Sequence, residues 1–172
     1  TFLGGVHTQE AVDVDDDDWS DLPRYRRALA RPRFVHASGA TSVELTAGVL
    51  SESRTGGTFA TDRHVQAVDT LRGDAGVIMS RTAGSHIIAA RGAVSFISND
   101  HRYGDEAYSD RHAAQFAEVS VLRGAGSHAI VVGAAIDRQT YRVEEFSAFD
   151  YAWTTPGLFA QDDWSIHPRW SV

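Results

Sequence analysis

Acidic residues crowd into one short stretch near the start of the chain, and their spacing raises the question of calcium binding. The run from Asp13 to Asp18 reads DVDDDD and places carboxylates at alternate positions, as at the start of an EF-hand loop. That loop also requires Gly at its sixth position and a bidentate Glu at its twelfth, where this chain has Asp18 and Arg24. We therefore interpret the run as a solvated acidic loop, and looser binding of a divalent ion stays open.

A second group of residues has the side chains that bind zinc or ferric iron, which are imidazoles and carboxylates. Nothing in their spacing fixes a common geometry, and loops accept polar residues at little cost. We predict no metal site and no cofactor for this chain. The group consists of Asp100, His101, Asp105, Glu106, Asp110 and His112.

Nucleophilic catalysis has little support in the sequence. Ser85 and Ser127 each precede a histidine, but neighbouring side chains in a strand point to opposite faces. The chain has no Gly-x-Ser-x-Gly motif and no glycine-rich phosphate loop. The prediction is that the protein is not an enzyme.

The composition is that of a folded chain of about one domain. It has 172 residues, of which 42% are hydrophobic and 23% charged, and a net charge of -7 that argues against nucleic-acid binding. Cysteine is absent, which excludes disulfides and thiolate metal sites, and no apolar run approaches the ~18 residues of a membrane-spanning helix. Both ends, Thr1 and Val172, lie in extended segments, so residues 1–172 are expected to be a piece of a longer protein.

A repeat organises the chain. The sequence RTAGSH at Arg81–His86 returns as RGAGSH at Arg123–His128, a shift of 42 residues. Gly-Ser between alternating residues indicates a two-residue hairpin turn, and longer polar stretches such as Asn99–Asp110 separate these turns as loops. The pattern predicts an all-β antiparallel meander of about eight long strands. We place them at 2–12, 25–37, 41–54, 69–82, 86–98, 111–123, 128–142 and 155–166.

The register of two predicted hairpins tests this interpretation, because a slip of one residue exchanges the two faces of a strand. A turn at Gly84-Ser85 pairs apolar residues with one another, and so does a turn at Gly126-Ser127. The apolar pairs are Val94 with Ala75, Ala90 with Met79, Phe96 with Gly73, Val121 with Val132, Val119 with Ala134, and Ala117 with Ile136. The opposite face is polar, and it carries Arg72, Asp74, Arg91, Glu118 and Asp137.

Such a sheet fits either a soluble sandwich, with its apolar face in a core, or an outer-membrane barrel, with its apolar face toward lipid. Predicted strands of about 12–14 residues exceed the usual ~5–6, and short turns alternate with long loops, as in membrane barrels. Aromatic residues near the strand ends could form the interface girdles of a barrel. In this interpretation Arg72, Asp74, Arg91, Glu118 and Asp137 face the lumen, where ion pairing is favoured over a path for an anionic substrate.

One segment carries a family resemblance. Residues 157–169, GLFAQDDWSIHPR, resemble the strand-and-turn motif of TonB-dependent outer-membrane receptors, in which an aromatic residue, Gln-Asp and a Trp precede a short turn. The stretch from His112 to Gly124, with the Gly126-Ser127 turn, is also similar to hairpins of that family. The sharp motif covers only the end of the chain, and no plug domain or TonB-contact segment is recognisable.

The resemblance implies a barrel of about 22 strands, filled by a plug domain, in the bacterial outer membrane. Such a receptor binds a scarce nutrient, for example a siderophore, and imports it with energy from the inner-membrane TonB complex. The expected partners are membrane lipids, the plug and remaining strands of the parent protein, the TonB complex, and an extracellular small-molecule or glycan ligand. Two alternatives stay open, which are a closed eight-stranded barrel acting as an anchor or adhesion protein, and a soluble β-sandwich binding module.

Overall fold

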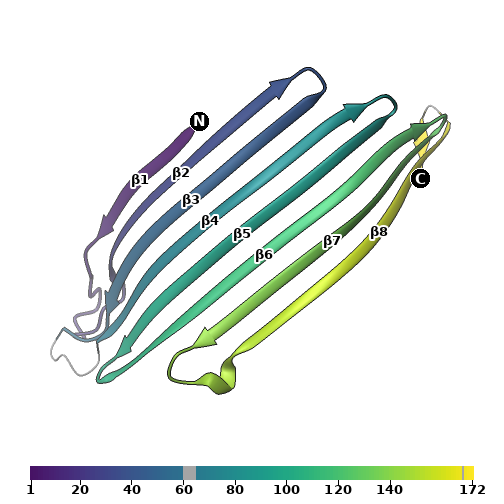
Figure 1. The fold of residues 1–172 in the computed structure, drawn as a ribbon. Coiled ribbons are helices and arrows are strands. Elements are labelled where there is room, and N and C mark those ends of the chain that lie inside the picture. Colours follow the sequence, from purple (N-terminus) through teal and green to yellow (C-terminus); the bar gives the residue numbers. More distant parts are fainter. Residues whose placement is uncertain (60–64, 168) are drawn as a thin grey trace.

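Nine antiparallel strands form one sheet in which each strand pairs with its neighbours in the sequence (Figure 1). The structure is a computed structural model that describes residues 1–59, 65–167 and 169–172. The predicted antiparallel meander is confirmed. The strands are β1 Phe2–Gln9, β2 Arg24–Ser38, β3 Thr41–Gly56, β4 Gln66–Ala83, β5 His86–Tyr103, β6 Glu106–Ala125, β7 His128–Val143, β8 Tyr151–His167 and β9 Trp170–Ser171, with a short 3-10 helix, η2, at Ser147–Phe149.

Four tight turns join neighbouring strands, and each begins with a glycine. Gly39, Gly84, Gly104 and Gly126 have φ between 55° and 64°, and the residues that follow them are not left-handed. A positive φ at the first central position alone is the pattern of a type II′ turn, whose twist matches that of the flanking strands. The predicted turns at Gly84-Ser85 and Gly126-Ser127 are both present.

The predicted registers of both hairpins are confirmed residue by residue. Ala75 lies opposite Val94 and Met79 opposite Ala90 in the β4–β5 pair. Val121 lies opposite Val132 and Ala117 opposite Ile136 in the β6–β7 pair. The sheet therefore has one apolar and one charged face, which we call by those names below.

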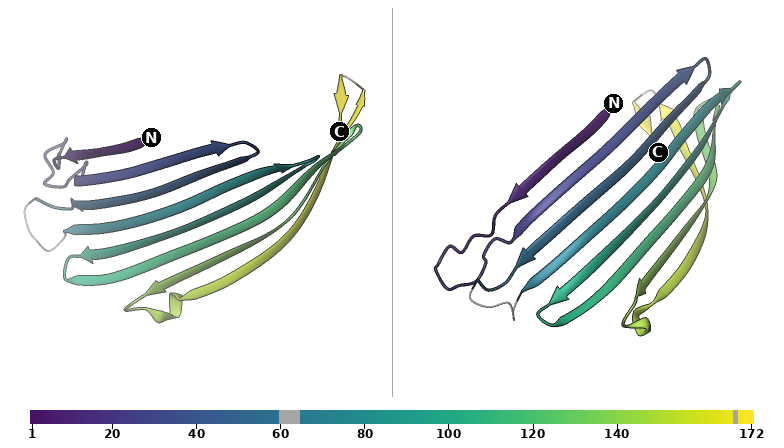
Figure 2. Two further views of the ribbon diagram at one scale, coloured as in Figure 1. Left: turned by 45° about the horizontal axis from the view of Figure 1, so that its top comes forward. Right: turned by 60° about the vertical axis from the view of Figure 1, so that its left-hand side comes forward.

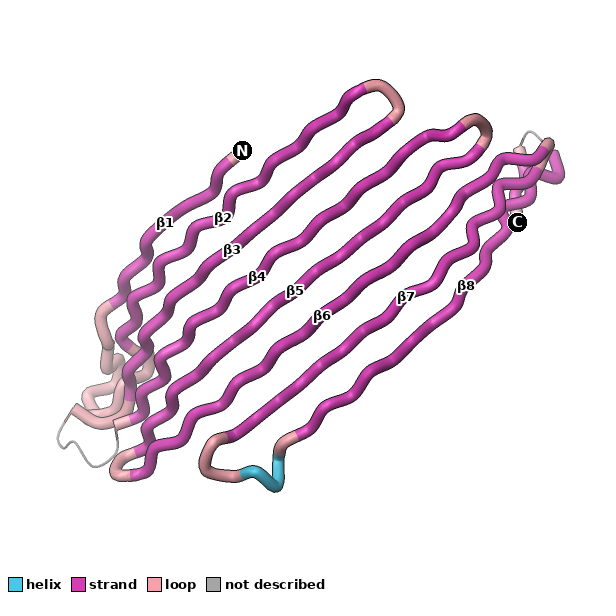
Figure 3. Tube along the Cα trace, viewed as in Figure 1, coloured by secondary structure: helices cyan, strands magenta, loops and turns pink. Residues whose placement is uncertain are grey.

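The long loop predicted at Asn99–Asp110 is wrong. Strand β5 continues to Tyr103, and β6 begins at Glu106 after the two-residue turn Gly104-Asp105. The polar residues that suggested a loop hydrogen-bond across the strand pair instead; Asn99 Nδ2, for example, donates to Asp110 Oδ1 over 3.0 Å. Short turns and long loops consequently do not alternate strictly, as the strand trace in Figure 3 makes clear.

The sheet is curved and open (Figure 2). Strand β1 forms one edge and pairs only with β2, and it does not meet β8 as a closed eight-stranded barrel requires. The described residues also lack the second sheet that a soluble sandwich needs to cover Val77, Val94 and Val132, which are 39–53% exposed.

A conventional hydrophobic core is missing from the described part of the chain. Val143 is the one buried hydrophobic residue there, and no side chain is less than 2% exposed. The accessible surface is 12127 Å², whereas a folded monomer of this mass exposes about 8,300 Å². Among these residues no helix has the length and apolar character needed to cross a membrane.

Candidate functional site

On this sheet the apolar side chains are exposed and the carboxylates are largely covered, which is the reverse of the arrangement in a soluble protein. Val94, Val119 and Val132 on the apolar face are 53%, 55% and 49% exposed. The carboxylate side chains of Glu52, Asp74 and Glu118 on the charged face are only 12%, 20% and 15% exposed. Soluble proteins bury valine and expose carboxylates. We therefore treat the charged face as the candidate functional site.

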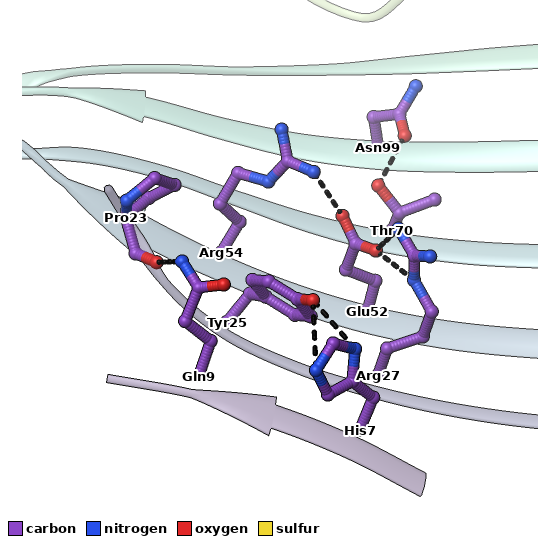
Figure 4. A network of polar contacts seen from close by, with 9 residues as sticks. All are labelled: His7, Gln9, Pro23, Tyr25, Arg27, Glu52, Arg54, Thr70 and Asn99. Carbon is purple, nitrogen blue, oxygen red and sulfur yellow. Dashed lines mark hydrogen bonds and ion pairs between the residues drawn. The ribbon is translucent and has the colours of Figure 1, made fainter. Parts of the chain in front are cut away.

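Arginines and carboxylates form ion pairs on this face, within one strand and between strands. We call the end of the sheet that carries the β1–β2, β3–β4 and β7–β8 connections the long-loop end, and the opposite end the short-turn end. At the long-loop end of the charged face, Arg27 from β2 and Arg54 from β3 both bind Glu52 (Figure 4). Toward the other end, Arg33 holds Glu44 through two hydrogen bonds, from Nε over 2.8 Å and from Nη2 over 2.7 Å. Such bidentate contacts fix both side chains, because the guanidinium presents its donors as a rigid fork.

The predicted lumen-facing residues lie on this face, and the structure brings four of them together in two pairs. Arg72 Nε lies 3.9 Å from Asp74 Oδ1, and Arg91 Nε lies 3.5 Å from Glu118 Oε1. Asp137 is apart from both pairs and accepts a hydrogen bond from Gln139 Nε2 over 3.2 Å. Sequence reasoning missed Glu52 and Arg54, although their period-two spacing on β3 places them on this face.

A shallow hollow of about 310 Å³ opens at the centre of the charged face. Arg31, Arg72, Asp74 and Asp137 are among its lining residues. Arg31 Nη2 donates to both Asp74 oxygens, over 2.7 and 2.8 Å, and Arg72 also lies within 4 Å of Asp74, so three of these four charges are paired and Asp137 accepts from neutral Gln139. The arrangement suits a hydrated, neutralised surface more than a binding site for one ion.

Polar and aromatic side chains build a second cluster on the same face, at the long-loop end. Asp110 is only 6% exposed and accepts from Asn99 Nδ2, and it lies 2.6 Å from His101 Nε2. The rings of Tyr103, His101 and Tyr108 stack beside this pair. Thr70 Oγ1 extends the network to β4 by donating to Asn99 over 2.9 Å (Figure 4).

This cluster contains part of the group considered for zinc or iron. His101, Asp110 and His112 share the charged face, whereas Asp100 lies on the opposite face, where Ser109 Oγ donates to it. Asp105 lies in the β5–β6 turn and Glu106 begins β6. Buried His101 Nδ1 and His112 Nε2 have no hydrogen-bond partner in the described part of the chain. No three ligand atoms of this group converge, so the residues do not form a metal-binding set.

The acidic loop between β1 and β2 does bring carboxylates together. Ligand atoms of Asp13, Asp15 and Asp21 all lie within 4.8 Å of one another. The Asp13 carboxylate already accepts from the backbone N–H groups of Asp17 and Asp18. The neighbouring carboxylate of Asp17 raises the pKa of Asp15 above its ordinary value, and partial desolvation and then Asp21 and Asp13 add to the effect.

Comparison with known proteins shows a likeness in fold alone. No family model and no curated protein sequence matches this chain. Among solved structures, the chain is similar to the ferric citrate transporter FecA in its unliganded form, with a TM-score of 0.58 and 9% sequence identity. The similarity covers 87% of this chain and 27% of the transporter, so the chain spans about a quarter of that protein. The all-β meander of this chain is therefore similar in fold to a part of that transporter.

Proposed function

We propose that residues 1–172 form part of the barrel wall of a TonB-dependent receptor in the bacterial outer membrane, which imports a scarce nutrient such as a siderophore. The observation that carries the proposal is the reversed exposure of the two faces. Apolar side chains exposed along a whole sheet face favour transfer out of water, by about 1.5–3 kcal/mol for each fully buried Val, Leu, Ile or Phe. Lipid provides that environment.

The width of the apolar band supports this proposal. On the apolar face of β6, Arg111 and Arg123 bracket Ala113, Gln115, Ala117, Val119 and Val121; on β7 the uncharged stretch is shorter, because Arg138 lies opposite Gln115. These arginines are twelve residues apart, which is about 40 Å along a strand at ~3.3 Å per residue. Strands of membrane barrels tilt by about 35–45°, which reduces this length to about 30 Å across the bilayer, close to the thickness of its hydrocarbon core.

The open edges of the sheet agree with a role as one sector of a larger wall. The outer edge of β1 and most of that of β8 carry backbone groups without a strand partner. In lipid each such group costs several kcal/mol, and a closed barrel removes the cost. We infer that other strands of the parent protein cover both edges and that its plug lies against the charged face. Arg72, Asp74, Arg91, Glu118 and Asp137 then face the lumen.

The likeness to a ferric citrate transporter favours transport over the anchor or adhesion alternative. Nothing in the ion pairs of the charged face selects a particular nutrient, because each arginine there already has a carboxylate of the sheet within 4 Å. In the proposed receptor, ligand choice belongs to the plug and the outer loops, and the present strands supply the wall and its water-compatible lining. Energy from the inner-membrane TonB complex acts on the parent protein.

The decisive experiment is to express the chain and ask where it partitions. We expect it to enter detergent micelles or bilayer vesicles as β-structure, and to aggregate in buffer without them. A stable, monomeric chain in buffer without detergent would contradict the proposal. For transport, deletion of the parent gene should abolish uptake of a radiolabelled ferric siderophore under iron limitation, and uptake unchanged across a panel of iron chelates would reject this ligand class.

A further inference from the structure

The arginines of the sheet differ sharply in whether they have a carboxylate partner. Those on the charged face each have one within 4 Å; they are Arg27, Arg31, Arg33, Arg54, Arg72 and Arg91. On the apolar face, Arg24 and Arg111 reach Glu10 and Glu144. Six further arginines on that face have no carboxylate within this distance in the described residues: Arg26, Arg81, Arg102, Arg123, Arg138 and Arg142. The guanidinium groups of these six arginines are therefore available to an anion from outside the sheet.

Three arginines occupy the apolar face of β6 and β7 within four residues of one another in register, toward the end of the sheet that carries the long loops. Arg111 lies directly opposite Arg142, and Arg138 precedes Arg142 by four residues on the same face of β7. Like charges directly opposite each other across a strand pair repel. Glu144 at 2.6 Å from Arg111 offsets only one of the three. We call these residues the Arg111–Arg138–Arg142 cluster.

An apolar groove leads to this cluster. It has a volume of about 600 Å³ and crosses the apolar face from β3 to β8 between two rows of side chains. Leu45, Val77 and Ile136 belong to one of these rows, and the small residues Gly92 and Ala117 stand between Val77 and Ile136 in the same row. The groove ends at Arg138 and Thr154 on β7 and β8, which places a cation at the end of an apolar channel.

We propose that the groove and the Arg111–Arg138–Arg142 cluster bind a phosphate-bearing membrane lipid, with its acyl chain in the groove and its phosphate on the arginines. The inference rests on the proposed function, because it requires this face to contact lipid. A guanidinium fork pairs with phosphate oxygens in a bidentate manner, and long side chains on a lipid-facing surface extend toward the headgroups. A second copy of the chain fits less well, since a two-fold contact through this patch would oppose arginine to arginine.

Lipid retention tests the proposal. The chain is folded in zwitterionic micelles with equal amounts of dioleoylphosphatidylglycerol and dioleoylphosphatidylcholine, and the retained lipid is measured by native mass spectrometry. We expect phosphatidylglycerol to be retained preferentially. The double variant Arg138→Gln/Arg142→Gln should lower its retention about twenty-five-fold, since each basic residue near an anionic lipid surface contributes on the order of fivefold. Circular dichroism and heat-dependent gel migration establish that each variant has folded.

A matched variant separates a site from general charge attraction. Arg81→Gln/Arg123→Gln removes two unpaired arginines from the same face at the short-turn end, and it should leave retention nearly unchanged. For the groove, Gly92→Leu should weaken retention of the dioleoyl lipid, whereas Ala134→Leu, outside the groove, should not. Equal retention of both lipids by the wild-type chain, equal loss in the two arginine variants, or a dimer without bound lipid would overturn the inference. A chain that stays out of micelles and vesicles would contradict the proposed function itself.

Discussion

Arg31 and Asp74 form an ion pair that spans β3 directly above Gly48. Arg31 Nη2 donates to the two Asp74 oxygens over 2.7 and 2.8 Å, although the residues belong to β2 and β4, which are not adjacent. A Cβ atom at Gly48 would lie 2.8 Å from Asp74 Oδ1 and 3.0 Å from Arg31 Nη2. The missing side chain is therefore what allows the pair to form.

Gly48→Ala should displace this pair and lower the free energy of unfolding by about 1 kcal/mol, the scale of a partly exposed charge pair. The measurement is chemical unfolding of the chain in detergent micelles. Gly5→Ala is the matched control. Gly5 lies on the same charged face as Gly48, and a Cβ atom there would have no other atom within 4 Å. If Gly48→Ala is equally destabilising in an Asp74→Asn background, the effect does not act through the pair.

Two adjacent residues on β5 test which face meets lipid. Val94→Arg places a charge inside the apolar band, two residues from Gly92 at its middle, and should destabilise the membrane-inserted chain by about 2–4 kcal/mol. Ser95→Arg places the same side chain on the charged face, opposite Asp74, and should cost little. The comparison uses reversible unfolding from vesicles. Equal costs for the two substitutions would argue against lipid contact on one face alone.

Asp110 is the most buried carboxylate that the structure describes, and its hydrogen bonds determine the third prediction. Asp110→Ala removes the acceptor for Asn99 and the partner of His101, so two polar groups lose their contact. We expect a loss of about 2–3 kcal/mol in unfolding free energy. The neighbouring Ser109→Ala loses one exposed hydrogen bond, to Asp100, and should cost less than about 1 kcal/mol.

The acidic loop gives a prediction in pH. Because Asp17 raises the pKa of Asp15, the folded loop binds protons more readily than the unfolded chain. Repulsion between the Asp15 and Asp17 carboxylates is therefore present when the pH is above the pKa of Asp15, and it disappears as the pH falls through that pKa. Carboxyl-carbon NMR titration should find the pKa of Asp15 above its ordinary value and lower in Asp17→Asn. Asp18→Asn is the control, since Asp18 does not contribute to the shift; an equal fall there would refute this cause.

The hairpin registers could be predicted because a two-residue turn fixes which residues face each other. Once Gly84-Ser85 is placed, the pairing of Val94 with Ala75 follows from the period of two. The extension of β5 to Tyr103 could not be predicted in this way, since polar composition there indicated a loop. Polar residues such as Asn99 and Asp110 are stable in strands because they bond to one another across the pair.

The charged face was predictable as a surface, but its individual contacts were not. Alternation places Arg72, Asp74, Arg91 and Glu118 on one side of the sheet. The choice of Arg31 as the main partner of Asp74 depends on a glycine in the strand between them. The Arg111–Arg138–Arg142 cluster on the apolar face, in which Arg111 alone has a carboxylate partner, is likewise recognised only from the distances between charged groups.

The strictly sequential strand order has a consequence for how such a wall is made. Each strand bonds to its immediate predecessor and successor, so contacts form at short loop distances and the entropic cost of closing each hairpin is modest. Growth can therefore proceed one hairpin at a time from either edge. The 42-residue spacing between two glycine-serine turns marks such a unit, and duplication or deletion of a whole hairpin would preserve the inside-outside alternation of every remaining strand.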